Sequence, residues 1–324
     1  MGRLNANANA NANANANANA NANANAGAGG GSGFVGNVRY NSHEFAKLLD
    51  PDAFPAEAPT DCMDAYEAAQ NAVNNIKFRK YWDAELRSSI YLNEFLTRNI
   101  NWVHDLKEAI YQAGPKVSDA KDAEVKEGLW QHLQSTKGEQ LRRVIEVSDE
   151  REERMLEIVD QDDADGFLKY WHAMLMIDAG HDPATCLLIR VARRVGEVVV
   201  MCLKEEYHEA RPSQVCPVIV PVMGPPVHPS FPSGHATQGH LIAACLKAAN
   251  RPQNQPDMLD RLARRMAQNR IIAGLHYPLD NEAGEAAAKK CFELLKRGAK
   301  FNELLAEAQK EGEQVSAVPA VRER

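Results

Sequence analysis

Basic side chains and histidines occur in three short segments of the C-terminal half, and their spacing suits the binding of an oxyanion. In the first segment, Lys204 and Arg211 are seven residues apart. On one helix, such a pair lies within roughly 20° of the same face, two turns apart, so both side chains can reach one anion. Taken alone, the pair is weak evidence for an anion-binding site, because two basic side chains on one helical face are usually solvated.

The second segment, residues 227 to 236, reads VHPSFPSGHA and predicts a helix that starts after Pro232. The backbone N–H groups of Ser233, Gly234 and His235 would then be among the free donors of the first turn, which point toward an anion. Glycine lets an oxyanion approach the backbone closely, and the serine hydroxyl adds a donor. His235 is a candidate general acid, because imidazole can donate a proton near neutral pH.

The third segment, residues 269 to 280, reads NRIIAGLHYPLD. Gly274 is expected to end the helix that carries Arg270, so His276 would project from the following turn. Asp280, four residues later, can accept a hydrogen bond from one imidazole nitrogen and leave a lone pair on the other. Such an imidazole is a nucleophile or a metal ligand.

Together the three segments resemble the three-part signature of a superfamily that joins type-2 phosphatidic acid phosphatases, soluble bacterial acid phosphatases and vanadium-dependent haloperoxidases. The resemblance covers about residues 183 to 295, and nothing in the N-terminal half contributes to it. One departure is Asn269, where members of the family commonly carry serine before the arginine. This difference concerns a minor supporting contact and leaves the main residues in place.

The resemblance implies a set of groups that bind the equatorial oxygens of phosphate or vanadate and neutralise the charge that develops there. These groups are the side chains of Lys204, Arg211, Arg270 and Ser233 and the amide of Gly234.

It also implies roles for three residues that act on the reacting atoms. His276 would attack phosphorus to give a phosphohistidine intermediate, or would ligate vanadium in a peroxidase. His235 would protonate the leaving alcohol and later activate water, or would assist peroxide binding. Asp280 would orient His276.

The motifs leave two reactions open, since vanadate mimics the five-coordinate state of phosphoryl transfer. His235 and Arg270 are only 35 positions apart, which is similar to the compact phosphatases. The stretch HPSFPSGHATQ, however, resembles algal bromoperoxidases, where a histidine precedes the motif serine by five residues, as His228 does here. His228 would then tune a bound peroxide or halide, although a solvated loop histidine explains it equally well.

We favour a phosphatase that hydrolyses a small phosphate monoester and needs no cofactor. The alternative is a haloperoxidase that holds vanadate on His276 and oxidises halide with hydrogen peroxide. A second alternative is a helical protein that binds an oxyanion without catalysis.

The elements that must position these residues are expected to be helices, because helix-forming residues dominate and apolar residues recur at intervals of three and four. The expected class is all-α, a helical bundle of the acid phosphatase/vanadium haloperoxidase type. Asp182 and Pro183 are expected to start a long helix as its N-cap and first residue. The expected helical segments are two or three helices in 61–113, charged helices in 118–160, and helices at 183–211, 233–249, 256–273 and 281–310.

The predicted organisation has four parts. Residues 1–36 form a disordered Asn-Ala and Gly-rich tract, 37–165 an N-terminal helical region, 166–312 the catalytic bundle and 313–324 a C-terminal tail. A repetitive Asn-Ala tract has too little apolar surface to offset its ordering entropy. The N-terminal helices would pack on the bundle or supply a homo-oligomer contact.

Composition limits the partners and the compartment. The 324-residue chain has a net charge of -7, so nucleic acid is not an expected partner. Its six cysteines are widely spaced, which favours reduced thiols over disulfides. Neither a signal peptide nor a membrane-spanning segment is evident, so we expect a soluble, cytoplasmic protein.

Overall fold

The computed structural model describes residues 82–118, 124–251 and 257–316. The chain divides into two units, Met1–Arg87 and Ser88–Arg324, and the candidate residues all belong to the second. The predicted tract at 1–36, the tail from 317 and the part of the first helical region before residue 82 lie outside the described residues. Among the described helices, none has the length and apolar character to cross a membrane.

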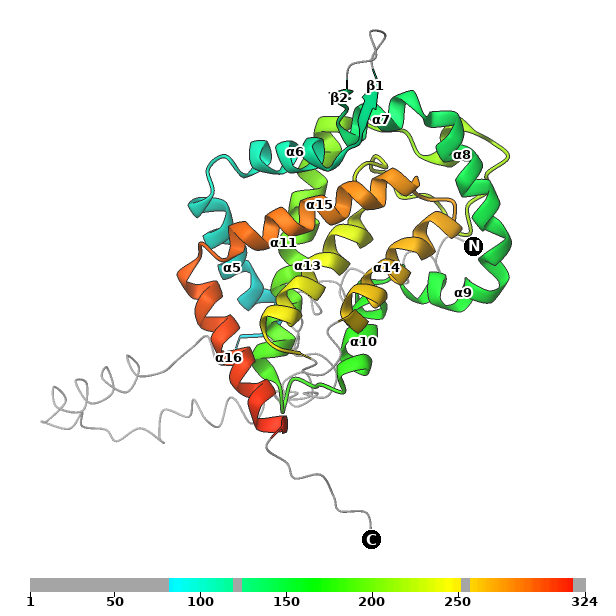
Figure 1. The fold of residues 1–324 in the computed structure, drawn as a ribbon. Coiled ribbons are helices and arrows are strands. Elements are labelled where there is room, and N and C mark those ends of the chain that lie inside the picture. The colour runs from blue at the N-terminus through cyan, green and yellow to red at the C-terminus, as the bar shows by residue number, and fades with distance from the viewer. Residues whose placement is uncertain (1–81, 119–123, 252–256, 317–324) are drawn as a thin grey trace, which may run out of the picture. The chain divides into compact units, whose positions relative to one another are not determined.

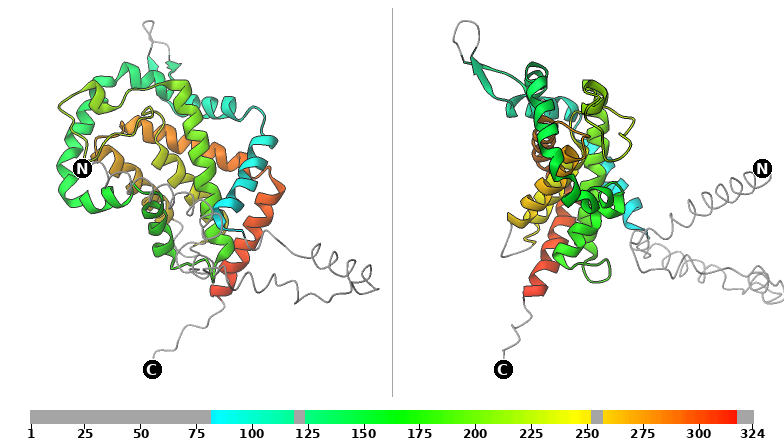
Figure 2. Two further views of the ribbon diagram at one scale, coloured as in Figure 1. Left: turned by 180° about the vertical axis from the view of Figure 1, so that it is seen from behind. Right: turned by 90° about the vertical axis from the view of Figure 1, so that its right-hand side faces the viewer.

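Helix α13 (Gly234–Ala248) is the central element of the second unit. It packs most extensively on α15 (Pro278–Leu295), α11 (Pro183–Tyr207) and α14 (Asp257–Ile272). Figure 1 shows α15 and α14 on either side of α13, and the view from behind in Figure 2 shows α11 crossing its back. The N-terminus of α13 and the adjoining ends of α14 and α15 therefore lie close together, and these ends carry the second and third motifs.

The other described elements surround this group, and the described residues are mostly helical as expected. They are α5 (Ala84–Arg98), α6 (Trp102–Ala113), β1 (Lys116–Ser118), β2 (Glu124–Lys126), α7 (Leu129–Ser135), α8 (Lys137–Glu146), the 3-10 helix η3 (Val147–Glu150), α9 (Arg151–Asp160), α10 (Ala164–Leu175), α12 (Pro212–Val215) and α16 (Ala299–Ser316). The two strands pair antiparallel, with Val117 opposite Val125, so the described helices of the range predicted at 118–160 begin only at Leu129.

The long helix α11 begins at Pro183 as predicted, but Asp182 does not cap it with its side chain. Instead Asp182 forms a buried ion pair with Arg251 at 2.8 Å. Glu311 of α16 accepts hydrogen bonds from the amides of Ala184 and Thr185, at 2.7 and 2.8 Å. A carboxylate from another helix thus satisfies the free donors of the first turn, a contact between distant residues that local sequence does not reveal.

Two predicted helices have the wrong bounds. The helix predicted to reach Arg211 ends at Tyr207, because His208 adopts the left-handed conformation (φ 51°) that closes the last turn. The helix predicted at 281–310 is two helices, α15 and α16, separated at residues 296–298. Helix α15 starts three residues early, at Pro278, so Asp280 lies in its first turn. Helix α16 reaches Ser316, so residues 313–316 of the predicted tail are helical.

Gly274 behaves as predicted, and the described thiols are unpaired. The five described cysteines are free, and Cys186, Cys245 and Cys291 are buried; Cys62 lies outside the described residues. Gly274 follows α14 with φ of 79°, a conformation that L side chains rarely adopt. The chain turns there and delivers His276 to the start of α15.

Candidate functional site

Lys204 is fully buried near the C-terminal end of α11, at 1% exposure. Its ammonium group donates to the carbonyls of Pro229 and Ser230, at 2.5 and 2.6 Å. An ammonium group has three donors, so one remains for a further acceptor. Lys204 therefore holds the loop before α13 in place and keeps one N–H for an anion.

Arg211 lies at the N-cap of α12 and not on the helix of Lys204, so the two side chains meet through the fold and not through helical spacing. The guanidinium is 1% exposed and donates to the carbonyls of Leu275 (2.7 Å) and His228 (3.2 Å). It also lies 3.1 Å from Nδ1 of His228 and 3.4 Å from Nε2 of His276. Arg211 thus joins the second and third motifs and faces two imidazole nitrogens.

His276 and Asp280 make the contact predicted by their spacing. Nδ1 of His276 lies 2.8 Å from Oδ2 of Asp280, and both side chains are buried. The same oxygen accepts from the Ser230 hydroxyl at 2.5 Å and from the Tyr277 amide at 3.0 Å. Three donors on one oxygen fix the carboxylate, which in turn fixes the Nδ1–H tautomer of His276. Nε2 of His276, on the side of Arg211, keeps its lone pair.

Arg270 occupies the last turn of α14 and is 2% exposed. One guanidinium nitrogen donates to Oδ1 of Asp162 at 2.8 Å and lies 3.8 Å from the sulfur of Met223. The other two nitrogens, Nε and Nη1, are buried and have no hydrogen-bond partner. Buried charged donors without an acceptor are costly, so these N–H groups favour an anionic acceptor.

His235 is in the first turn of α13. Its Nε2 lies 2.8 Å from the carbonyl oxygen of Gln161, and its ring contacts Phe167 edge-on, with centroids 5.2 Å apart. A carbonyl only accepts, so Nε2 carries the hydrogen and Nδ1 is left for proton transfer. His235 makes no direct hydrogen bond to His276 or the three cations, and only electrostatic effects link it to them.

Ser233 is the N-cap of α13, as predicted, and its hydroxyl accepts from the Ala236 amide at 3.4 Å. Its own amide, however, donates to the carbonyl of Asp280 at 2.9 Å, so one of the three predicted anion-binding amides is already used. No such partner is found in the described residues for the amides of Gly234 and His235. A hydrogen bond therefore joins the start of α13 to the third motif, and the amides of Gly234 and His235 remain available as donors.

Asn269, the departure from the family pattern, links α14 to α9. Its amide nitrogen donates to Gln161 at 3.0 Å and to Glu157 at 3.1 Å, and its oxygen accepts from Arg154 at 2.9 Å. Because Gln161 also holds His235, Asn269 helps to place that imidazole. A serine side chain is too short to make all three contacts.

Burial and the three cations shift the pKa values of the site. Burial, with Arg211 nearby, lowers the pKa of Lys204 to about 7. Burial, followed by Lys204, Arg211 and Arg270, lowers the pKa of His276 well below its ordinary value. Burial and Arg270 lower the pKa of His235 to about 3. Both histidines are therefore neutral in the absence of an anion.

His228 and Asp280 also respond to burial. Burial lowers the pKa of His228, and Lys204 and Arg211 lower it further. Burial raises the pKa of Asp280 to about 6, although its hydrogen bond from Ser230 opposes this shift. The site thus has an excess of positive charge that a bound oxyanion would balance.

Sequence reasoning missed Ser230, Gln161 and Asp162. Ser230 is 50 positions from its partner Asp280, and Asp162 is 108 positions from Arg270. No local pattern predicts such contacts. The one available signal is that Ser230 lies in the segment HPSFPSGHA, which contains the second motif.

Comparison with family models and with curated proteins finds no match for this chain. The resemblance therefore depends on the three motifs alone. The geometry offers a buried group of three cations, an imidazole whose unprotonated Nε2 faces Arg211, and a second imidazole whose unprotonated Nδ1 can take part in proton transfer. Such a set can bind a tetrahedral oxyanion and transfer its central atom.

Proposed function

We propose that this protein is a phosphatase that hydrolyses small phosphate monoesters through a phosphohistidine at His276. The main support is Arg270, whose buried Nε and Nη1 have no acceptor beside two other buried cations. Each of these charged N–H groups can donate a strong hydrogen bond to a phosphate oxygen. The phosphate would then be neutralised by Arg270, Lys204 and Arg211.

In the first step, the lone pair on Nε2 of His276 forms a bond to phosphorus while the bond from phosphorus to the ester oxygen breaks. The hydrogen bond from Nδ1 to Asp280 orients the ring and stabilises the cationic product. The low pKa of His276 keeps the nucleophile unprotonated.

His235 would supply a proton to the leaving oxygen from Nδ1, because its Nε2 is held by Gln161. Its pKa of about 3 applies without an anion. Burial is the first cause of that low pKa and the cations are the second. A bound phosphate dianion would offset the cations and raise the pKa, which increases the fraction of the acid form. In the second step water attacks phosphorus, its proton passes to His235, and the bond to Nε2 breaks.

One observation favours a vanadium-dependent haloperoxidase as a second candidate. His228 is half-buried, and its Nδ1 lies 3.1 Å from Arg211, so it belongs to the site. The donor set fits vanadate, since Lys204, Arg211 and Arg270 would hold its oxygens and Nε2 of His276 would ligate vanadium. Bound vanadate would supply peroxide-driven oxidation of halide.

A paired assay on one preparation separates the two candidates. Release of p-nitrophenol from p-nitrophenyl phosphate is measured beside bromide oxidation with added vanadate and hydrogen peroxide. We expect phosphate release, and its loss in His276→Ala. Bromide oxidation without phosphate release would replace the proposal by the second candidate. If neither reaction occurs but vanadate binds, the protein is an oxyanion-binding protein.

A further inference from the structure

A cleft of about 610 Å³ lies on a different face of α14 and α15 from the candidate site. On α14, Arg261, Arg264 and Arg265 line it at helical spacings of three and four, which is one face of the helix. Arg270 is nine residues after Arg261, on the opposite side at 100° per residue. The cleft is therefore separate from the buried cations of the site.

Two of these arginines have no partner. Among the described residues, neither Arg261 nor Arg264 makes a hydrogen bond or an ion pair, although Arg264 acts electrostatically on Glu285. Both are exposed and lie one turn apart, so their Cβ atoms are about 5–6 Å from each other. Their guanidinium groups can therefore converge on one anion.

The neighbouring arginines are held in place. Arg265 makes a bidentate contact with Glu157, in which its Nε lies 2.8 Å from Oε2. Arg154 donates to Asn269 at 2.9 Å and lies 3.7 Å from Glu157. Arg265 and Arg154 are thus paired with carboxylates, so the unpaired positive charge of the cleft is that of Arg261 and Arg264.

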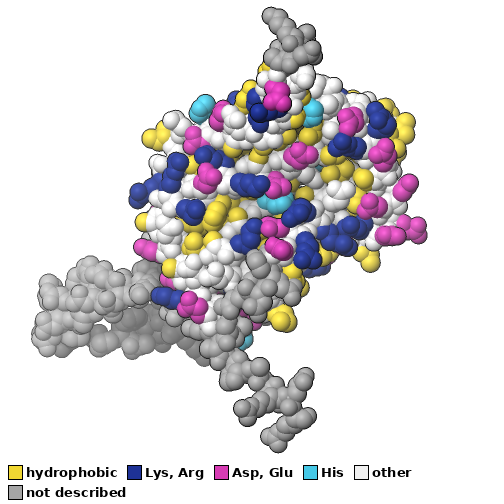
Figure 3. Space-filling model, in the orientation of Figure 1, with side chains coloured by type: hydrophobic (Ala, Val, Ile, Leu, Met, Phe, Trp, Pro, Cys, Tyr) yellow, Lys and Arg dark blue, Asp and Glu magenta, His cyan; other side chains and the backbone are white. Residues whose placement is uncertain are grey.

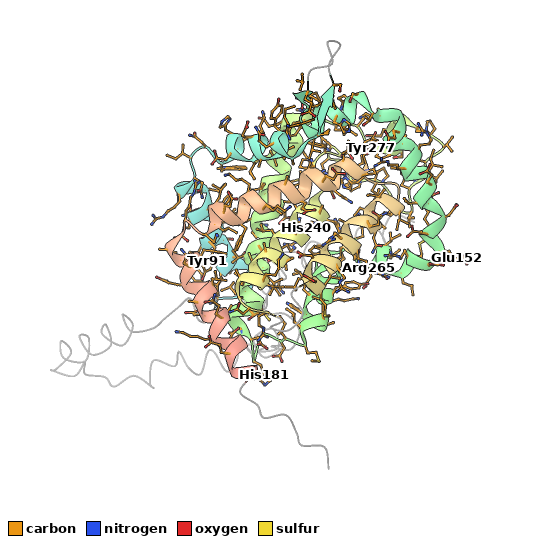
Figure 4. The ribbon with its side chains drawn as sticks, in the orientation of Figure 1. Tyr91, Glu152, His181, His240, Arg265 and Tyr277 are labelled. Atoms are coloured by element: carbon orange, nitrogen blue, oxygen red, sulfur yellow. The ribbon has the colours of Figure 1, made fainter. Side chains whose placement is uncertain are left out.

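The acidic residues of the cleft are partly neutralised. Glu285 forms an ion pair with Lys289 at 2.8 Å and faces His240 at 3.8 Å. Burial raises the pKa of Glu282, which favours its neutral form, and lowers the pKa of His240, so Lys289 and not His240 balances the charge of Glu285. Figure 4 places His240 between α15 and α14, and Figure 3 shows dark blue side chains gathered over α14 on the same face. The surface is thus locally basic in a chain with a net charge of -7.

We propose that this cleft binds a phosphate-bearing small molecule, with Arg261 and Arg264 as its principal ligands. The guanidinium fork matches phosphate oxygens, and the volume is within the usual range for small-molecule sites, roughly 300–1,000 Å³. A long nucleic acid would need a more extended basic surface than one cleft, and the net charge opposes it.

Calorimetric titration of tripolyphosphate at low salt tests the proposal. We expect binding to the wild-type protein, and a loss of at least about tenfold in affinity in Arg261→Gln/Arg264→Gln, because each charge-assisted hydrogen bond to phosphate is strong. The matched control is Arg98→Gln/Lys310→Gln, which removes two charges from exposed side chains on other helices and should bind as the wild type does.

Arg270→Gln separates this cleft from the candidate site. Binding that persists in Arg270→Gln but falls in Arg261→Gln/Arg264→Gln supports the cleft. Binding lost in Arg270→Gln and kept in the double variant, or lost equally in the control, overturns it. Circular dichroism of each variant confirms that it is folded.

Discussion

At the scale of single residues, the site is unusual for the charge that it buries. Lys204, Arg211 and Arg270 are each at most 2% exposed, and the buried carboxylate among them is that of Asp280. Taking ions out of water is costly unless they are paired. A bound oxyanion is the simplest counter-charge, and it would meet the partnerless donors of Arg270.

Lys204 should make anion binding depend on pH near neutrality. Its pKa is lowered to about 7, so its ammonium form predominates below that pH and is lost above it. Sulfate stays a dianion over the range, so its affinity should fall by up to about tenfold per pH unit above 7. Calorimetry between about pH 6 and 9 measures this. In Lys204→Gln binding should be weak throughout, and an unchanged pH profile there would remove Lys204 from the site.

Ser230 should support catalysis without touching the substrate. In Ser230→Ala, Asp280 loses a charge-assisted hydrogen bond and His276 a neighbour at 3.3 Å. We expect kcat for p-nitrophenyl phosphate to fall by about tenfold with little change in KM. Ser135→Ala, which removes an exposed serine hydroxyl, is the control. Equal rates for the two variants would show that Ser230 has no positioning role.

The residues that sequence could identify are those linked by short spacing. His276 and Asp280 are four positions apart, and Ser233 directly precedes α13, so motif and local structure coincide. Ser230 and Gln161 reach the site only through packing of distant segments, which spacing does not encode.

At the scale of elements, helix ends position the chemistry, and helix ends were also where prediction was least accurate. The helix predicted to reach Arg211 ends earlier, at Tyr207, because His208 adopts a left-handed conformation. Arg211 therefore lies on an extended turn, where its side chain reaches the carbonyl of Leu275. Apolar periodicity defines the body of a helix and leaves its last turn to tertiary contacts.

Close packing of α15 on α13 should be needed for the site. A Cβ at Gly284 would lie 2.8 Å from both the Ser233 carbonyl oxygen and the Ala236 Cβ. Gly284→Ala should therefore destabilise the protein by about 1–3 kcal/mol and displace the start of α13. Gly138→Ala, in α8 with nothing near the added Cβ, should be neutral or stabilising by up to about 1 kcal/mol. Denaturant unfolding measures both, and equal stability would contradict the packing argument.

At the scale of the whole molecule, the helical class followed from composition because helix formers dominate and apolar residues recur at three and four. The separation of α15 from α16 and the capping of α11 by Glu311 did not follow, since both depend on contacts between distant segments. The predicted boundaries between the four parts of the chain, after residues 36, 165 and 312, stay predictions.

Filling the site should stabilise the folded chain, because the unfolded chain does not assemble the three cations. At a phosphate concentration of 100 times Kd, linkage gives about 2.7 kcal/mol, which raises the midpoint of thermal unfolding. Arg270→Gln should abolish most of this increase. The same increase in the variant would mean that phosphate acts elsewhere on the protein.

The most direct test of the central claim, that the three cations and His276 surround one oxyanion, is a crystal structure with tungstate. We expect tungsten density beside Nε2 of His276, with oxygens bound by Nε or Nη1 of Arg270 and by the ammonium of Lys204. Tungstate that binds well but never among these residues, with Nε and Nη1 of Arg270 still without an acceptor, would contradict it.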